Sequence, residues 1–291
     1  MLGFTKRFQS IAGCRVAFYH RGTGPAIVLL HGMPTSCYLW RDVVASLQRN
    51  FQVVAPDLLG LGDTFGPMDV DHSLQGQASL LVGLLGRLEI EEAVLVGHDI
   101  GGAVAQILAL ELPRRVRGLV LVASAAYDNW PVPVIRMFQR LAEHPLAWRM
   151  AIRAGIMRKV GLAEQGFRRG VHFPGSLRDE DIDEYLRPSR LSSSSREHLR
   201  RLLISLDNRE TQQLGHRLGE IECPSLVLWG AEDAFLSPHW GRRLRTDLRS
   251  SSLHILTNCG HFVPEERAGE LAGLVDAFAA RCFLEPRTGA R

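Results

Sequence analysis

Cysteine, lysine and long apolar runs are all scarce in this sequence of 291 residues. The five cysteines are scattered, without a C-x-x-C motif or a cluster with histidine, which argues against a disulfide framework and a zinc site. No stretch approaches the roughly 18 apolar residues that a membrane helix needs. The first 20 residues lack the apolar segment of a signal peptide. We therefore expect a cytoplasmic protein with reduced thiols.

Neither positive nor negative charge is in large excess. The cationic residues are almost all arginine, and 34 of them stand against 31 acidic residues, which leaves a net charge of +3. So small an imbalance argues against nucleic acid or a membrane as the partner. The hydrophobic fraction of 46% and the chain length are enough to bury a large core, which excludes disorder.

Short apolar segments recur along the chain and predict β-strands that are buried on both faces, because they lack polar alternation. They lie at 26–30, 52–55, 93–96, 119–122, 225–229 and 253–256. Segments with helical periodicity lie between or after them, at 73–88, 101–112, 240–248 and 265–283. Strands that alternate with helices predict an α/β fold with a mostly parallel central sheet.

One interval, residues 130–220, breaks this alternation. It contains helical segments rich in arginine and no strand-like run, with Pro131 at its start and Pro224 just after its end. We interpret it as a helical cap inserted into the sheet domain, so that the core consists of residues 1–129 and 221–291. The simplest interpretation of the many arginines is a solvated outer face of the cap.

A glycine-bounded aspartate follows the third buried run. In the sequence GHDIG at 97–101, glycines two residues before and after Asp99 permit a tight strand-to-helix turn that holds one side chain out from the sheet. This is the pattern of a nucleophile elbow, which usually carries serine. Asp99 could instead cap the helix that follows. His98 should point away from the reactive side, because neighbours diverge in so tight a turn.

Three other loops also follow predicted strands. Asp233 comes after the run at 225–229, and His261 comes after the last run. Met33 follows the first run, and its backbone N–H could join that of Ile100 in stabilising an oxyanion. A nucleophile, an acid and a histidine thus occur in a fixed order along the chain, each beyond a strand.

With this order, and over nearly its whole length, the chain resembles the α/β-hydrolase superfamily. Within it, the chain looks like the branch with an aspartate nucleophile, which includes epoxide hydrolases, haloalkane dehalogenases and haloacetate dehalogenases. Residues 31–41, HGMPTSCYLWR, are especially similar to haloalkane dehalogenases. The resemblance implies an α/β-hydrolase fold with a helical cap, and a triad of Asp99, His261 and Asp233. Some dehalogenases place the acid after the preceding strand, so Asp128 is an alternative.

An aspartate nucleophile changes the expected chemistry. The carboxylate of Asp99 is ionised near neutral pH without a base, and it can attack saturated carbon to form an ester. His261 then activates water as a general base, and Asp233 orients the imidazole. The N–H groups of Met33 and Ile100 would hold the oxyanion on the carboxyl group of Asp99. Water is the second substrate, and neither a cofactor nor a metal is needed.

The first choice of substrate is a small, largely apolar epoxide. Epoxide hydrolases supply an acidic donor from the cap, and Tyr185 with His172 is the candidate pair here, with Trp130 as a further substrate contact at the cap entrance. Tyr185 could equally be a packing residue of an amphipathic helix.

Two alternatives stay open. The first is a haloalkane or haloacid dehalogenase, although the haloalkane enzymes carry Trp after the nucleophile and often Asn after His-Gly, where this chain has Ile100 and Met33. Such an enzyme would need unusual halide donors, such as Trp130 or Asn129. The second alternative is a non-catalytic binding protein, or a cofactor-free oxygenase or lyase, on the hydrolase scaffold. A homodimer is also left open.

Overall fold

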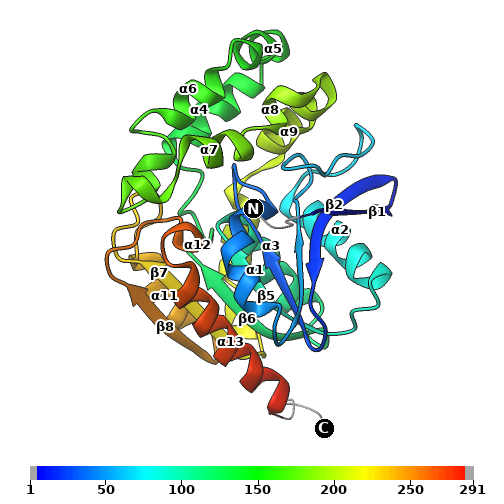
Figure 1. Ribbon diagram of the computed structural model, residues 1–291, viewed down its shortest axis with the longest axis vertical. Helices are drawn as coiled ribbons and strands as arrows, with labels where there is room; N and C mark the ends of the chain where they lie inside the picture. The colour runs from blue at the N-terminus through cyan, green and yellow to red at the C-terminus, as the bar shows by residue number, and fades with distance from the viewer. Residues whose placement is uncertain (1–4, 286–291) are drawn as a thin grey trace.

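The computed structural model describes residues 5–285 and has an eight-stranded sheet at its centre (Figure 1). The strand order is β1-β2-β4-β3-β5-β6-β7-β8. The pairs β1–β2 and β2–β4 are antiparallel and the other pairs are parallel, so the predicted mostly parallel sheet is confirmed. The strands are β1 Arg7–Ile11, β2 Cys14–Arg21, β3 Ala26–Leu30, β4 Gln52–Pro56, β5 Ala93–His98, β6 Val116–Val122, β7 Ser225–Gly230 and β8 Ser251–Leu256.

Burial explains most of the strands that the sequence reveals. The run at 253–256 was wrongly predicted to be buried on both faces, because it belongs to edge strand β8, in which only Leu256 is buried. Every residue of β3, β5 and β7 is buried, because helices cover the sheet, and these strands are continuous apolar runs. Strand β1 lies at the sheet edge, is mostly exposed and has a polar sequence. The apolar pattern therefore did not predict β1, and it also missed β2, which pairs with it.

The core helices flank this sheet (Figure 1). They are α1 Arg41–Leu47, α2 Leu74–Arg87, α3 Ile100–Glu111, α11 His239–Asp247, α12 Val263–Glu266 and α13 Ala268–Leu284, with the 3-10 turn η1 Cys37–Trp40 before α1. The helix predicted at 265–283 is interrupted at Arg267, whose backbone leaves the helical conformation at φ −133°. The Arg267 guanidinium donates instead to the backbone carbonyls of Thr257 and Asn258, at 3.0 Å each, in the preceding loop.

The segment between β6 and β7 is helical and forms the upper part of the molecule in Figure 1, as the sequence predicts. Its helices are α4 Pro133–Ala142, α5 Pro145–Arg153, α6 Ile156–Leu162, α7 Asp179–Tyr185, α8 Pro188–Leu191, α9 Ser193–Ser205 and α10 Asn208–Gly215, with 3-10 turns η2 Phe167–Gly170, η3 Pro174–Ser176 and η4 Leu218–Glu220. Proline occupies the first turn of α4, α5 and α8, where its missing N–H is not needed. Helix α10 packs against α3 of the core.

Polar contacts join the cap to the core along a seam. Within the core, the Arg41 guanidinium of α1 donates to both carboxylate oxygens of Glu265 in α12, at 2.7 Å each, and the hydroxyl of Tyr185 in cap helix α7 contacts the same carboxylate. An ion pair crosses the seam between Arg187, which lies between α7 and α8, and Asp63 of the core, at 2.6 and 2.9 Å. The Glu265 side chain is only 1% exposed, so the first of these contacts is shielded from solvent.

Candidate active site

Asp99 lies in the turn between β5 and α3, with a backbone φ of +53°. This conformation is unusual for a residue other than glycine and costs about 1–3 kcal/mol. The neighbouring chain is too close for side chains: a Cβ at Gly97 would lie 2.4 Å from the carbonyl oxygen of Gly101, and one at Gly101 would lie 2.4 Å from the carbonyl oxygen of Leu30. The glycines of the motif are therefore a steric requirement of the turn. Asp99 stands at the N-cap position of α3, yet its side chain makes no capping bond.

Two backbone N–H groups point at the Asp99 carboxylate instead. The N–H of Met33 donates to Oδ1 at 2.9 Å, and the N–H of Ile100 also hydrogen-bonds the carboxylate. Burial raises the pKa of Asp99 above its ordinary value, although the two N–H groups and the nearby His261 favour the charged form. The structure thus brings together the three groups that were expected to form the nucleophile and its oxyanion site.

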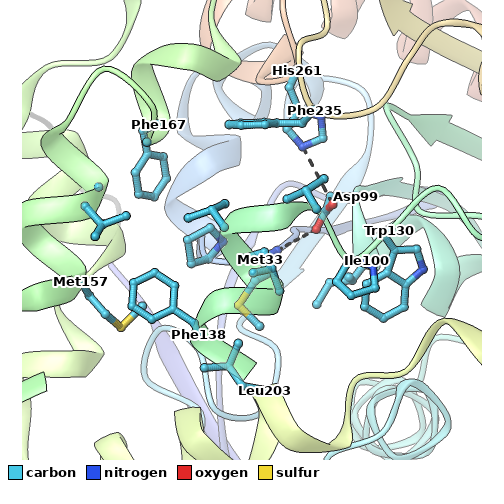
Figure 2. Close-up of a pocket in the computed structure, with 18 of the residues that line it drawn as sticks. Met33, Asp99, Ile100, Trp130, Phe138, Met157, Phe167, Leu203, Phe235 and His261 are labelled. Atoms are coloured by element: carbon cyan, nitrogen blue, oxygen red, sulfur yellow. Dashed lines mark hydrogen bonds and ion pairs between the residues drawn. The ribbon is translucent and has the colours of Figure 1, made fainter. Parts of the chain in front are cut away.

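His261 lies between two carboxylates. Its Nδ1 is 3.0 Å from Oδ2 of Asp233. On the other side of the ring, Nε2 is 3.9 Å from Oδ2 of Asp99 (Figure 2). Asp233 is held in turn by the N–H groups of Phe235 and Leu236, which donate to its other oxygen at 2.9 and 2.8 Å. Burial alone would lower the pKa of His261, but the charges of Asp233 and Asp99 outweigh it and raise this pKa. The imidazole is therefore oriented by Asp233 and presents Nε2 to Asp99.

Two further residues that the sequence raised, His98 and Asp128, lie outside this arrangement of Asp99, His261 and Asp233. His98 is fully buried, and its Nε2 donates to the backbone carbonyl of His261 at 3.0 Å, so it braces the loop that carries His261. Burial, together with the neighbouring His261, holds the pKa of His98 well below its ordinary value, so it is a neutral donor. Asp128 is exposed, and the carboxylate that contacts His261 is that of Asp233.

A glutamate that the sequence did not single out also holds this loop. Glu266 of α12 accepts the N–H of Gly260 at 2.6 Å and the N–H of His172 in the cap at 2.7 Å. It therefore ties the loop before His261 to the cap. In the sequence, acidic residues in the first turn of a helix are ordinary, so nothing marked this one.

A cavity of about 90 Å³ opens beside Asp99 and extends toward the cap (Figure 2). Asp99, His261 and Trp130 are the only polar or ionisable side chains among the described residues that line it. The rest of the wall is apolar side chains and glycine, with Phe138, Met157 and Leu203 on the cap side. This volume is smaller than the about 150 Å³ of an apolar cavity that binds benzene, so the space as it stands suits a substrate smaller than benzene and without polar groups.

Tyr185 and His172 do not line this cavity. Tyr185 is buried behind the wall: its ring stacks on that of Phe167, with 5.8 Å between centroids, and its hydroxyl is used by Glu265. His172 is exposed, and its ring contacts Phe173. The expected ring-opening pair is therefore not assembled at the cavity in this structure.

Trp130 does line the cavity, but its N–H is already engaged. The indole Nε1 donates to Oγ1 of Thr211 at 2.8 Å, and Figure 2 shows this nitrogen on the side of the ring turned away from Asp99. Asn129 is used locally, since its side chain bonds the backbone of Ala126 and Ser124. Neither of the two halide donors that the sequence suggested, Trp130 and Asn129, thus has a side-chain N–H group directed at the cavity in this structure.

Residues 5–285 contain no group of three or more histidine, cysteine or acidic side chains placed to hold a metal ion. The helices in this range are too short or too polar to cross a membrane.

Comparison with known proteins gives one consistent fold. The α/β-hydrolase fold family matches residues 25–268. A soluble epoxide hydrolase from Corynebacterium sp. strain C12 is 30% identical over 269 residues, covering 88% of this chain and 91% of that protein. Haloalkane dehalogenase 2 of Mycobacterium tuberculosis CDC 1551 is 27% identical over 286 residues, 94% of each.

Solved structures show the same fold. The epoxide hydrolase CorEH superposes with a TM-score of 0.77 at 26% identity, covering 96% of this chain and 98% of that chain. The haloalkane dehalogenase DbeA from Bradyrhizobium elkani USDA94 superposes with a TM-score of 0.78 at 22% identity, covering 96% and 99%.

Proposed function

The chain belongs to the α/β-hydrolase family, and from that premise we propose that it hydrolyses a small apolar substrate through a covalent ester at Asp99. One observation carries the proposal: a carboxylate occupies the elbow, bonded by two N–H groups and 3.9 Å from a histidine that is itself oriented by Asp233. A carboxylate at an acyl carbon would give an anhydride, whereas at saturated carbon it gives an ester that can be hydrolysed.

In the first step, one oxygen of Asp99 attacks an sp3 carbon, and the carbon–leaving group bond breaks on the opposite side. The apolar wall supports this step, because it positions an apolar substrate and keeps water from solvating the carboxylate. The N–H groups of Met33 and Ile100 hydrogen-bond the carboxylate, so the carboxylate is already oriented toward the cavity before the substrate enters.

In the second step, Nε2 of His261 takes a proton from water, and the water oxygen adds to the carboxyl carbon of Asp99. The N–H groups of Met33 and Ile100 then stabilise the oxyanion. When this intermediate collapses, the bond between the carboxyl carbon of Asp99 and the alkoxy oxygen breaks. The alkoxide leaves as the alcohol with the proton from the His261 imidazolium, and Asp99 loses a proton to water to become the carboxylate again. Formation of the ester removes the negative charge of Asp99, which is one of the groups that raise the pKa of His261. The pKa of His261 should therefore fall when the ester forms, so that the imidazole can act as a base at a lower pH.

The leaving group decides between the candidate substrates. Opening an epoxide releases an alkoxide, which needs a proton, and the described lining offers no acid on the cap side. A halide leaves as a stable anion without a proton. The cavity therefore favours an alkyl halide over the epoxide that the sequence suggested, with Trp130 as the donor if it leaves Thr211. Epoxide opening is the second candidate, and the 30% identity to a soluble epoxide hydrolase supports it.

The test is single-turnover chemistry with the His261→Gln variant, offered a short brominated alkane and, separately, an epoxide of the same carbon chain length. We expect a mass increase on the peptide that contains Asp99 and one equivalent of bromide released per enzyme. The exposed His172→Gln variant is the matched control and should turn over as the parent does. Absence of any adduct at Asp99 with either electrophile would overturn the covalent mechanism. An adduct from the epoxide alone would reverse the order of the two substrates.

A further inference from the structure

The outer face of cap helices α4 and α5 combines unpaired cations with exposed apolar side chains. We propose that this face docks the protein on an anionic lipid surface. The overall charge of +3 gives no hint of this, because the charge is distributed unevenly. The inference does not depend on the reaction proposed above.

The segment from α4 to α6 is strongly cationic. Residues 133–162 contain five arginines and one lysine, but only one acidic residue, Glu143. Arg158 is paired with Asp183 at 2.7 Å. The other cations are exposed, and none has an ion pair with an acid in the described part of the chain: Arg136, Arg140, Arg149, Arg153 and Lys159. By contrast, Arg200 and Arg201 of α9 share Glu197, so the excess positive charge belongs to the α4–α6 end of the cap.

Large apolar side chains stand among these cations. Leu146 is 69% exposed, Met150 is 62% exposed and Met137 is 46% exposed. On α5, Leu146, Met150 and the cation Arg153 lie four and three residues apart, so they follow one stripe of the helix. Helices α4 and α5 contact each other, which places Met137 on a neighbouring helix of the same end of the cap. Figure 1 shows this end at the top of the molecule, away from the sheet.

The opposite faces of these helices are well packed. Phe138 of α4 and Trp148 and Ile152 of α5 are buried. The exposed apolar residues are therefore not a consequence of a loosely folded segment. The inner face of α4 also lines the cavity through Ile135 and Phe138. Docking would place this wall of the cavity between the carboxylate of Asp99 and the lipid. Apolar molecules concentrate in the lipid.

The chemistry favours lipid over other anionic partners. Arginine and lysine reach phosphate headgroups while leucine and methionine enter the acyl boundary, and both types of side chain are then satisfied. A nucleic acid would use the cations through its phosphates but would leave Leu146 and Met150 against water. The helices are not long enough to span the bilayer, so the contact would be peripheral and reversible.

The experiment is co-sedimentation of the full-length protein with vesicles of phosphatidylcholine alone and of phosphatidylcholine with phosphatidylglycerol. We expect binding to the anionic vesicles only, weakened by salt. Arg149→Gln with Arg153→Gln should weaken it by about 30-fold, since each cation near such a surface contributes roughly a five-fold effect. Leu146→Gln with Met150→Gln should weaken it as well, and more visibly at high salt, where the apolar contribution dominates.

The matched control is Arg49→Gln with Arg87→Gln, which removes the same charge from exposed positions of the core. This variant should bind as the parent does. The proposal is overturned if the parent protein does not bind anionic vesicles, or if the control loses as much affinity as the cap variant. Retention of full binding by the Leu146/Met150 variant at high salt, or tighter binding of the parent to duplex DNA than to vesicles, would also overturn it.

Discussion

The core and the cap use polar residues in opposite ways. In the core, Asp99, His261 and Asp233 stand beyond the carboxyl ends of parallel strands, and each is held by further hydrogen bonds. The cap, by contrast, presents an almost wholly apolar wall to the cavity. In the mechanism that we propose, the core would supply the reacting groups, and the cap would supply shape and exclusion of water.

The largest expected effect comes from removing the reactive carboxylate of the core. Asp99→Asn should lower turnover by at least about 10⁴-fold, because the amide cannot form the ester. The measurement is product release under saturating substrate, with folding checked by circular dichroism. Asp128→Asn makes the same chemical change at an exposed position and should stay within about two-fold of the parent. A comparable loss in Asp128→Asn would show that the acid had been assigned to the wrong residue.

Breaking the contacts between the cap and the core should mainly affect the free energy of unfolding. Glu265→Gln removes the buried carboxylate that the half-buried Arg41 guanidinium and the Tyr185 hydroxyl of the cap share, which typically costs about 3–5 kcal/mol in the free energy of unfolding. Urea denaturation measures it. The control is Glu220→Gln, which breaks an exposed pair with Arg217 on the cap surface and should have no measurable effect. Equal stability of the two variants would mean that the seam does not hold the cap.

Acid should destabilise the core through its buried histidines. Burial lowers the pKa of His31 to about 4, so the folded state binds this proton less readily than the unfolded state, whose histidine has the ordinary value of 6.5. The free energy of unfolding should therefore fall as the pH drops below about 6.5, with about 3 kcal/mol lost from His31 by pH 4. Urea denaturation at several pH values measures this slope.

The seam contributes a weaker acid response in the same direction. His72 and His198, whose ring nitrogens are 3.0 Å apart, join the core to α9 of the cap, and burial lowers the pKa of both. His31→Gln should remove more of the pH dependence than His72→Gln does. An unchanged slope in His31→Gln would assign the acid response to other groups.

The smallest expected effect comes from the N-terminal capping residues of two helices, one in the core and one in the cap domain, which form a closely matched pair. Ser73 caps α2 of the core by accepting the N–H of Gly76 at 3.1 Å, and Ser192 caps α9 of the cap by accepting the N–H of Ser195 at 3.0 Å. Alanine at either position should cost about 1 kcal/mol. Because buried contacts join the two regions, we expect both variants to shift one cooperative thermal transition. A separate, earlier transition that moves only in Ser192→Ala would show that the cap unfolds alone.

The sequence was most informative where local geometry and burial are coupled. The run at 26–30 predicted β3 to the residue, and the run at 93–96 found β5 together with the glycine-bounded turn after it. Edge strand β1 was missed because its side chains meet solvent. The break at Arg267 was missed because it depends on carbonyls of a loop that precedes it in the fold.

The sequence by itself determined the fold and the presence of a carboxylate on a strained turn. Steric limits on the backbone and the burial of apolar strands depend on residues that are neighbours in the sequence, so a local pattern reveals them. Only the tertiary structure decided what faces that carboxylate. Tyr185 lies in the cap as expected, but its hydroxyl meets Glu265, 80 residues along the chain, rather than the cavity. The polarity of a cavity depends on which distant side chains converge on one volume, and spacing along the chain does not specify that convergence.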